Sequence, residues 1–231
     1  MTTTLSHPIP AHSDIQAAIR TRLDWGIEVL QQLIAVDSIA PNELECQRLL
    51  YKLLSSEGLA TELHEMSDLL RSLDGFHEDG LTLENRPNLV ATYGGTKPGS
   101  QSLILNAHID TVEWKTQVGS WKYLPLSGMI DNDCIYGRGA LDDKGQIVMA
   151  AMAILALKDL AYCPPGKVIL ESVVGEEPSG NGTLALCSLG YTADAAINLE
   201  PTENHLHYGH RGVAGWRFHT YGRAEHGSVN G

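Results

Sequence analysis

The chain has 231 residues, of which 43% are hydrophobic and 19% are charged, a composition typical of a globular protein that can bury a sizeable core. Its 16 Lys and Arg residues stand against 28 Asp and Glu residues, which gives a formal net charge of −12 at pH 7. This balance argues against a nucleic-acid-binding surface, because such a surface needs a cluster of Lys and Arg. An acidic surface does not otherwise identify a partner.

The four cysteines are far apart and form no C-x-x-C pair: Cys46, Cys134, Cys163 and Cys187. We expect buried, unpaired thiols in a reducing compartment. The N-terminal segment MTTTLSHPIPAHSD has neither the basic nor the apolar region of a signal peptide, and the apolar run at residues 147–157 is too short to span a bilayer. The expectation is a soluble, cytoplasmic protein that binds no membrane and no nucleic acid.

Hydrophobic periodicity predicts two helices in the N-terminal part of the chain. Apolar residues at helical spacing predict the first over residues 14–36. The second is expected to begin at Asn42, which has capping-box spacing with Glu45, and to end at Gly58. Residues 67–87 mix charge, Gly and Pro, a pattern that favours a long excursion over the surface.

Strands and helices alternate from residue 88 onward. The predicted strands are residues 88–93, 103–105, 168–174 and 195–199, and the predicted helices are residues 143–157 and 181–189. Such alternation is typical of an α/β fold whose sheet contains parallel strand pairs. The chain shows no internal repeat and no low-complexity segment.

Polar clusters stand at the expected ends of the strands and at the start of the long helix. They are AHID with His108 and Asp110, GRGALDDKG with Asp142 and Asp143, GEEP with Glu176 and Glu177, and LEPT with Glu200. Ligands of open α/β sheets bind outside the carboxyl ends of the strands. One rim of the sheet is therefore expected to collect all four clusters.

The residue types in these clusters suit a metal site. An imidazole nitrogen with several carboxylate oxygens is a mixed ligand set compatible with zinc or a similar cation. Asp110, two residues after His108, is placed to hold the second imidazole nitrogen and fix its tautomer. So many acids in one crevice repel one another unless cations neutralise them. Two divalent ions about 3.5–4 Å apart, bridged by one carboxylate and one water, would resolve that conflict.

The GEEP cluster carries a geometric requirement. Neighbouring residues of a regular strand point to opposite faces, so Glu176 and Glu177 serve one site only if the strand bends there. Gly175 permits such a bend, and Pro178 ends the strand pattern. The alternative is a solvated loop in which both carboxylates are simply exposed.

Two other clusters also have structural alternatives. Asp143 and Gln146 have capping-box spacing, so Asp143 is expected to cap the long helix while Asp142 turns to the metals. His205 and His207 would share a strand face, but no acid recurs near them. We expect these two histidines at surface or interdomain positions.

The ordered signals AHIDT, YGRGALDDKGQ, GEEPSGNG and LEPT resemble the co-catalytic di-zinc deacylases and exopeptidases. That family includes acetylornithine deacetylase, succinyl-diaminopimelate desuccinylase, aminoacylase-1 and bacterial glutamate carboxypeptidase. The resemblance implies a zinc-exopeptidase-like α/β catalytic domain with a mostly parallel central sheet flanked by helices. Residues 1–13 would be a flexible arm, 14–210 the N-terminal part of the catalytic domain, and 211–231 the truncated start of an α+β lid and dimerisation domain.

The resemblance implies a role for each matched metal ligand. Two divalent ions, zinc or cobalt, would be bound by His108, Asp142, Glu177 and Glu200. Asp142 would bridge the two ions, and the Asp142–Asp143 peptide bond would be cis. Asp110 would stand behind His108. The family also has a downstream histidine ligand after its lid, which this sequence does not reach, and a catalytically inert metal-binding fragment is therefore the second hypothesis.

The resemblance also implies a reaction. Glu176 would take a proton from metal-activated water and deliver it to the leaving amine. His226, in GRAEHGSVNG, would reach the neighbouring subunit's active site and polarise the scissile carbonyl. The expected activity removes an acetyl- or succinyl-type group from an N-acyl amino acid, and a dipeptidase or carboxypeptidase is the alternative. The full-length protein is expected to form a homodimer through its lid, whereas this fragment would be monomeric or aggregation-prone.

Overall fold

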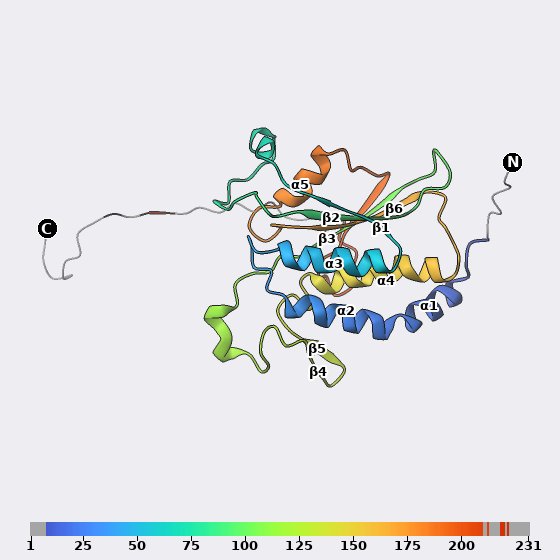
Figure 1. Cartoon of the computed structure of the whole chain (residues 1–231), viewed down its shortest axis with the longest axis horizontal. Coiled ribbons are helices and arrows are strands. Elements are labelled where there is room, and N and C mark those ends of the chain that lie inside the picture. The colour runs from blue at the N-terminus through green and yellow to red at the C-terminus, as the bar shows by residue number, and fades with distance from the viewer. Residues whose placement is uncertain (1–7, 210–211, 213–217, 220, 222–231) are drawn as a thin grey trace, which may run out of the picture. The chain divides into compact units, whose positions relative to one another are not determined.

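The computed structural model describes residues 8–209, 212, 218–219 and 221, and a five-stranded sheet flanked by helices is its central feature (Figure 1). The chain divides into two units, Met1–Pro201 and Thr202–Gly231. All helices and strands of the described residues belong to the first unit. The arm, the domain boundary at residue 210 and the lid remain predictions.

The helices of the described part are α1 (His12–Thr21), α2 (Leu23–Ala35), α3 (Leu44–Ser56), α4 (Lys144–Asp159) and α5 (Asn181–Ser188), with short 3₁₀ helices at Asp68–Ser72 and Lys115–Ser120. The strands are β1 (Ala60–His64), β2 (Asn88–Gly94), β3 (Leu103–His108), β4 (Met129–Asp131), β5 (Cys134–Tyr136), β6 (Lys167–Val173) and β7 (Ala195–Asn198). The four strands and two helices predicted from residue 88 onward are all present. The α/β fold class is confirmed.

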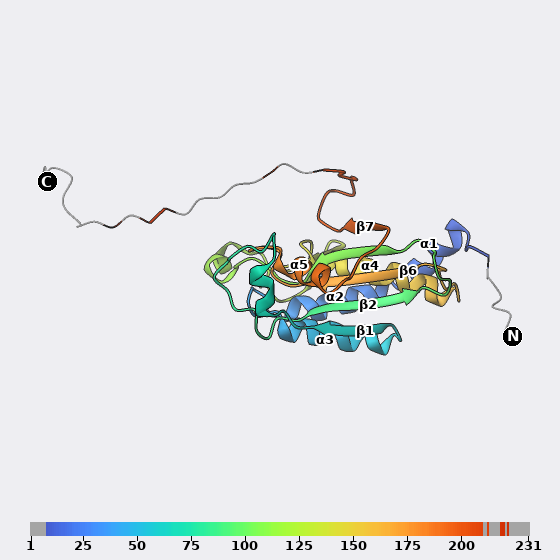
Figure 2. The same ribbon diagram turned by 90° about the horizontal axis from the view of Figure 1, so that it is seen from above.

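The main sheet has the order β1-β2-β6-β3-β7 (Figure 2). β3 pairs in parallel with both β6 and β7, whereas β2 runs antiparallel to β6 and to β1. The three strands that precede the GEEP, AHID and LEPT clusters are thus mutually parallel. Their carboxyl ends meet at one edge of the sheet, as the sequence predicted.

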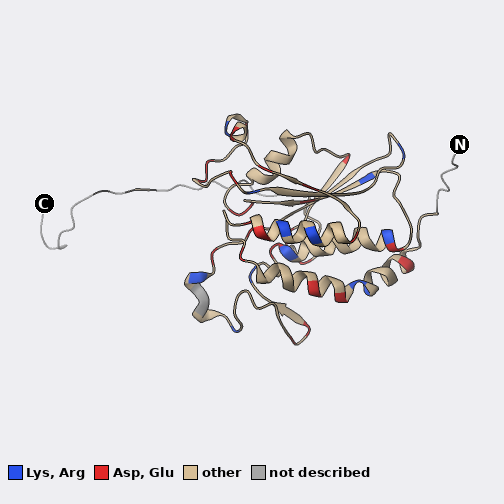
Figure 3. Cartoon of the chain, viewed as in Figure 1, with Lys and Arg blue, Asp and Glu red and all other residues tan. Residues whose placement is uncertain are grey.

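Helices α1 to α4 lie on one side of this sheet and α5 lies on the other (Figure 1). α4 packs against β3 and β6 and also against α1 and α2, which explains why its sequence is apolar on almost every side. A smaller apolar cluster lies on the α5 side and consists of Val90, Ile104, Ile169, Val173 and Leu186. Figure 3 shows Lys and Arg scattered singly over the helices and loops rather than gathered in one stripe of the described chain.

Two expectations about the N-terminal helices are wrong. The single helix predicted over residues 14–36 is divided at Arg22, where the backbone N–H bonds to the Ile19 carbonyl, three residues back. The Arg22 guanidinium forms ion pairs with Glu57 and Asp159, each at 2.6 Å. The predicted capping box at residues 42–45 is not formed, because Glu43 is the N-cap residue and makes no side-chain cap.

Further differences involve exposed elements with weak patterns. β1 and the β4–β5 hairpin were not predicted, because their residues are mostly half-buried or exposed and carry little apolar alternation. Of the four cysteines only Cys46 is buried, whereas the other three are exposed, so the expectation of buried thiols is wrong for them. All four are unpaired. Among the described residues, no helix has the length and apolarity needed to cross a bilayer.

The core packing predicts a large cost for truncation in the central strand. Leu170 lies in β6 and is 0% exposed, whereas Leu124 is 71% exposed. We expect Leu170→Ala to lower the free energy of unfolding by about 2–5 kcal/mol, because it removes buried contacts and leaves a cavity. Leu124→Ala is the matched control and should change it by less than about 0.5 kcal/mol. Urea titration followed by circular dichroism measures both, and equal effects would contradict the assignment of the core.

The buried carboxyl group of Glu171 is expected to make the stability of the fold depend on pH. It is buried in β6, where its carboxylate accepts a hydrogen bond from Asn106 Nδ2 at 2.8 Å. Burial raises the pKa of Glu171, although the bond from Asn106 acts to lower it. The folded chain therefore binds this proton more tightly than the unfolded chain, and ionisation of Glu171 costs stability at neutral pH.

We therefore expect Glu171→Gln, which keeps an acceptor oxygen for Asn106, to raise the free energy of unfolding at pH 7. The gain should shrink as the pH falls toward the ordinary pKa of 4.5, because Glu171 is then protonated in both states. Urea titrations at pH 7 and pH 4 measure the difference. The same gain at both pH values would show that charge is not its cause.

Candidate metal centre and active site

The carboxyl edge of the parallel strands brings together the polar clusters of the sequence. β3 ends at His108, the turn after β6 carries the GEEP pair, and Glu200 follows β7 by two residues. Asp142 and Asp143 directly precede α4. The sequence-predicted site residues found in this cluster are His108, Asp110, Asp142, Glu176, Glu177 and Glu200.

His108 is the buried centre of the cluster. Its Nδ1 lies 3.0 Å from the main-chain oxygen of Asp110, and its Nε2 lies 2.9 Å from Asp142 Oδ1 and 3.9 Å from Glu176 Oε2. Burial, the largest single effect, acts to lower the pKa of His108, but the carboxylates of Asp110, Asp143 and Glu176 together outweigh it and raise the pKa to about 10. With Nδ1 directed to a carbonyl, Nε2 is the nitrogen that faces the acids and is the one available to a metal ion.

Asp110 makes a contact that its sequence spacing did not reveal. Its carboxylate is 3.6 Å from His108 Nδ1, so the atom within hydrogen-bonding distance of the imidazole is the Asp110 carbonyl. The two carboxylate oxygens instead accept the main-chain N–H groups of Glu176 and Glu177 at 3.1 and 3.2 Å. Asp110 is completely buried and thus connects the end of β3 with the turn after β6.

The turn after β6 shows the bend that the glutamate pair requires. Gly175 has a φ of +67°, a left-handed conformation that glycine adopts without a steric penalty. The Gly175 carbonyl then accepts hydrogen bonds from Ser179 and from the N–H of Gly180. Both glutamate side chains are exposed at this edge, where they can reach one site. The solvated-loop alternative does not account for the two backbone bonds to Asp110.

Asp142 and Asp143 are joined by a cis peptide bond, as the family resemblance implied. The expected helix cap is wrong, because Asp143 occupies the N-cap position of α4 without a side-chain cap bond. Its Oδ2 accepts the main-chain N–H of His108 at 3.1 Å, and its buried Oδ1 has no hydrogen-bond partner among the described residues. Burial raises the pKa of Asp143 to about 8, with a further increase from the charges of Glu200 and Asp142. Sequence spacing therefore missed Asp143 as a member of the site.

The geometry of the cluster fits divalent metal ions. The side chains form two groups, and within each group the possible ligand atoms all lie within 4.8 Å of one another. One group is His108, Asp142 and Glu177, and the other is His108, Asp143 and Glu200. An unpartnered buried carboxylate oxygen is costly, and a cation would satisfy it. Burial also raises the pKa of the Glu176, Glu177 and Glu200 carboxyls, with neighbouring acids adding to the increase. Positive charge would relieve this repulsion.

Comparison with known proteins identifies the family. Residues 104–223, just over half of the chain, match the peptidase family M20/M25/M40. The chain belongs to this family. The resemblance read from the ordered sequence motifs is therefore confirmed.

Relatives within and around the family differ in their named activities. The N-formyl-4-amino-5-aminomethyl-2-methylpyrimidine deformylase of Bacillus subtilis is 36% identical over 131 residues, which are 56% of this chain and 30% of that protein. A Staphylococcus aureus protein named "Probable succinyl-diaminopimelate desuccinylase" is 34% identical over 148 residues, 63% of this chain and 35% of that protein. The chain thus spans about a third of the length of these curated relatives.

A solved structure supports the fold independently. Human carnosine dipeptidase 1 superposes with a TM-score of 0.62 at 18% identity, and the match covers 81% of this chain and 41% of the dipeptidase. At that identity the likeness shows the fold alone. It agrees with an α/β catalytic domain of the peptidase family.

Three histidines singled out in the sequence belong to the C-terminal part of the chain. His226 falls outside the described residues, so its catalytic role stays a prediction. His205 and His207 belong to the second unit and are exposed.

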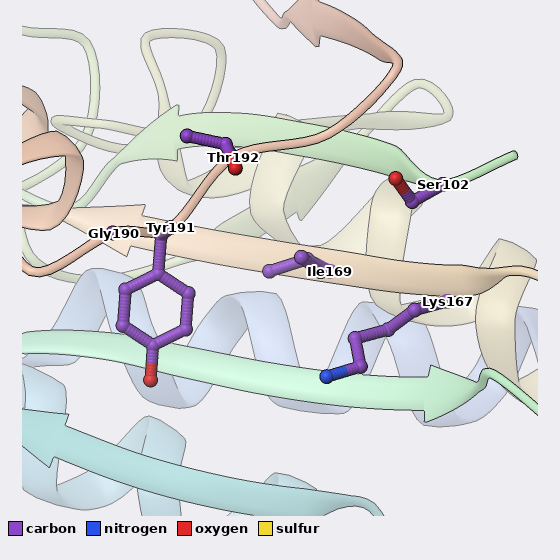
Figure 4. A pocket seen from close by; sticks show the side chains of 6 residues that line it. All are labelled: Ser102, Lys167, Ile169, Gly190, Tyr191 and Thr192. Atoms are coloured by element: carbon purple, nitrogen blue, oxygen red, sulfur yellow. The ribbon is translucent and has the colours of Figure 1, made fainter. Parts of the chain in front are cut away.

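A cavity of about 330 Å³ on the sheet is lined by Ser102, Lys167, Ile169, Gly190, Tyr191 and Thr192 (Figure 4). It contains no predicted site residue and lies at the amino ends of β3 and β6, opposite the metal centre.

The double acceptor role of Asp110 predicts the effect of a near-isosteric change. Asp110→Asn replaces one acceptor oxygen by an NH₂ group, so one of the two partly buried N–H groups at Glu176 and Glu177 loses its partner. We expect the free energy of unfolding to fall by about 1–3 kcal/mol. Asp194→Asn is the matched control, because Asp194 also accepts a main-chain N–H, from Ser102, but at an exposed position. Thermal and urea unfolding measure both, and an equally small loss in the two variants would contradict the role of Asp110 in holding this turn.

Proposed function

We propose that the protein containing this chain is a metal-dependent amidohydrolase that removes an acyl group, of acetyl or succinyl type, from an N-acyl amino acid. The observation that carries the proposal is the convergence of His108, Asp142 and Glu177 with Glu176 at one edge of the sheet. Such a set provides both ligands for divalent ions and a free carboxylate beside them. Membership in the peptidase family supports amide hydrolysis as the reaction class.

Each side chain has a definite part in this proposal. His108, Asp142, Glu177 and Glu200 would hold two divalent ions, zinc or cobalt. When bound, such ions supply Lewis-acid activation of water and of the scissile carbonyl. Asp143, which is buried with an unpartnered oxygen, would add negative charge behind the ligands.

Glu176 is the proposed general base. Its carboxylate lies 3.9 Å from His108 Nε2 and accepts no hydrogen bond from the described residues, so it is near the ligands and free to take a proton. Burial raises its pKa above the ordinary range, which brings it closer to the neutral pH at which a base is most effective. The protonated form then donates to the leaving amine, and the products are a carboxylate and a free amine.

The choice of acyl removal over peptide hydrolysis is supported by the relatives of higher identity, whose names describe a deformylase and a desuccinylase. The named substrate of the deformylase is an N-formylated aminomethylpyrimidine, so the amino acid part of the proposal draws on the desuccinylase. The alternative is a dipeptidase or carboxypeptidase, which is favoured by the structural likeness to the human dipeptidase. The proposed protein is cytoplasmic and forms a homodimer through its lid, with His226 acting in the partner's site.

Substitution of Glu176 tests the proposal directly. In the cobalt- or zinc-loaded full-length protein, Glu176→Gln should lower kcat for N-acetyl or N-succinyl amino acids by about 10²–10⁴-fold, because the base is lost. Metal content should stay at the wild-type level, since Glu176 is not a ligand. Glu177→Gln should instead reduce metal content. The matched control is Glu84→Gln, an exposed glutamate outside the site, which should leave both measurements unchanged.

The same assay separates the alternatives. Faster turnover of dipeptides than of N-acyl amino acids would assign the peptidase activity. The 231-residue chain is assayed in parallel, because the second hypothesis describes it as an inert metal-binding fragment. Metal content below one ion per full-length protein, with no chelator-sensitive turnover, would overturn the proposed function.

A further inference from the structure

Arg86 is a buried cation near the end of β6 that belongs to none of the metal-binding groups. Its side chain is 1% exposed, and that of its partner Glu43 is 0% exposed. Arg86 Nε and Nη2 donate to the two carboxylate oxygens of Glu43 at 3.0 and 2.6 Å, and Nη1 donates to the Thr82 carbonyl at 3.1 Å. This bidentate pairing holds the guanidinium in one orientation.

The oriented guanidinium lies directly against Gly175, the residue at which the chain turns from β6 toward the site. A Cβ added to Gly175 would lie 2.7 Å from Arg86 Nη2, closer than real Cβ contacts occur. No side chain fits between the guanidinium and the turn, so the position of Arg86 limits where the turn can lie. The φ of +67° at Gly175 is the conformation that directs the next two residues to the metal centre.

Asn88, two residues after Arg86, holds the chain on both sides of this turn. Its Oδ1 accepts the N–H of Val174 at 3.0 Å, and its Nδ2 donates to the Gly182 carbonyl at 2.9 Å. Gly182 approaches so closely that an added Cβ would lie 2.2 Å from the Val174 carbonyl oxygen. Residues 86–88 therefore contact the last residue before the turn, the turn itself and the first turn of α5.

The opposite side of the turn is held by Asp110, which accepts the N–H groups of Glu176 and Glu177. The turn thus lies against Arg86 at Gly175 and is bonded to Asp110 at Glu176 and Glu177, while the two glutamate side chains are exposed. Placement of the two carboxylates consequently depends on their backbone. A small shift of the turn would move both carboxylates relative to His108.

We propose that Arg86, oriented by Glu43, is a positioning residue that sets the distance of Glu176 and Glu177 from His108. The inference deepens the proposed function and rests on it. Stability alone does not account for the pair, since a buried ion pair is often no more stabilising than apolar side chains of similar size. Its geometric effect on Gly175 is what apolar side chains would not reproduce.

The test compares Arg86→Met with Arg22→Met. Arg22 likewise pairs with acids, Asp159 and Glu57, each at 2.6 Å, and Asp159 lies at the opposite end of α4 from the site. Both variants lose a paired arginine, so Arg22→Met controls for general loss of stability. A third variant combines Glu43→Leu with Arg86→Met and so removes both buried charges. Arg86→Met alone leaves Glu43 buried and unpaired, and the double variant takes its place in the comparison where the single variant does not fold.

Three measurements report on the turn. In the full-length protein, Co²⁺ titration should show binding about 10–100-fold weaker in the Arg86 variants, the usual effect of removing an outer support of a metal ligand. The visible absorption spectrum of bound Co²⁺ should also change, because it responds to ligand geometry. In the metal-free protein, amide hydrogen exchange at residues 175–180 should be faster than in the wild type. Arg22→Met should match the wild type in all three.

The outcomes are distinguishable from failure of the proposed function. A wild-type protein that binds no Co²⁺ would overturn the proposed function, and unchanged amide exchange in the Arg86 variants would separately overturn the positioning role. Wild-type Co²⁺ affinity and spectrum in a folded Arg86 variant would also overturn it. Equal changes in the Arg22 and Arg86 variants would assign Arg86 to general stability and reject the inference.

Discussion

Repulsion between carboxylates is the constraint on which this structure depends. Six acids and one imidazole lie at the carboxyl edge of three parallel strands, and burial raises the pKa of several of them. An arrangement of this kind is unfavourable in the absence of positive charge. In the metal-free chain the imidazolium of His108 supplies one such charge. Divalent ions, which bind the neutral imidazole, would supply positive charge in its place. The close grouping of ligand atoms is therefore best understood as preparation for metal binding.

The cluster combines buried, hydrogen-bonded residues with exposed carboxylates. His108, Asp110 and Asp143 are buried and make main-chain hydrogen bonds, whereas Asp142, Glu176 and Glu177 project from the edge. Gln47 of α3 reinforces this framework, since it bonds to the Ser172 carbonyl at 2.7 Å and accepts the Ser172 hydroxyl at 3.0 Å. Buried polar contacts of this kind fix the ends of strands that apolar packing alone would leave adjustable.

Much of the architecture could be predicted from local patterns. The elements β6 and α4 were predicted correctly because continuous apolar runs of their lengths are typical of a buried strand and a buried helix. The polar clusters were placed at one edge because parallel strands align their carboxyl ends. The division at Arg22 and the edge strand β1 were not predicted, since both depend on contacts with residues distant in the sequence. The exposed cysteines show the same limit, because composition does not reveal which face of α5 or of a hairpin meets solvent.

The sequence by itself determined the chemistry available to this protein. The order of the motifs identified the family and predicted the ligand types. The residues that carry it are His108, Asp142, Glu176, Glu177 and Glu200, together with the glycine before the glutamates. Tertiary structure decided which atoms meet. Asp110 uses its carbonyl for the imidazole and its carboxylate for the GEEP backbone, and Asp143 faces the site instead of capping α4. Side-chain direction and burial arise from packing between distant segments, so residue spacing alone could not establish them.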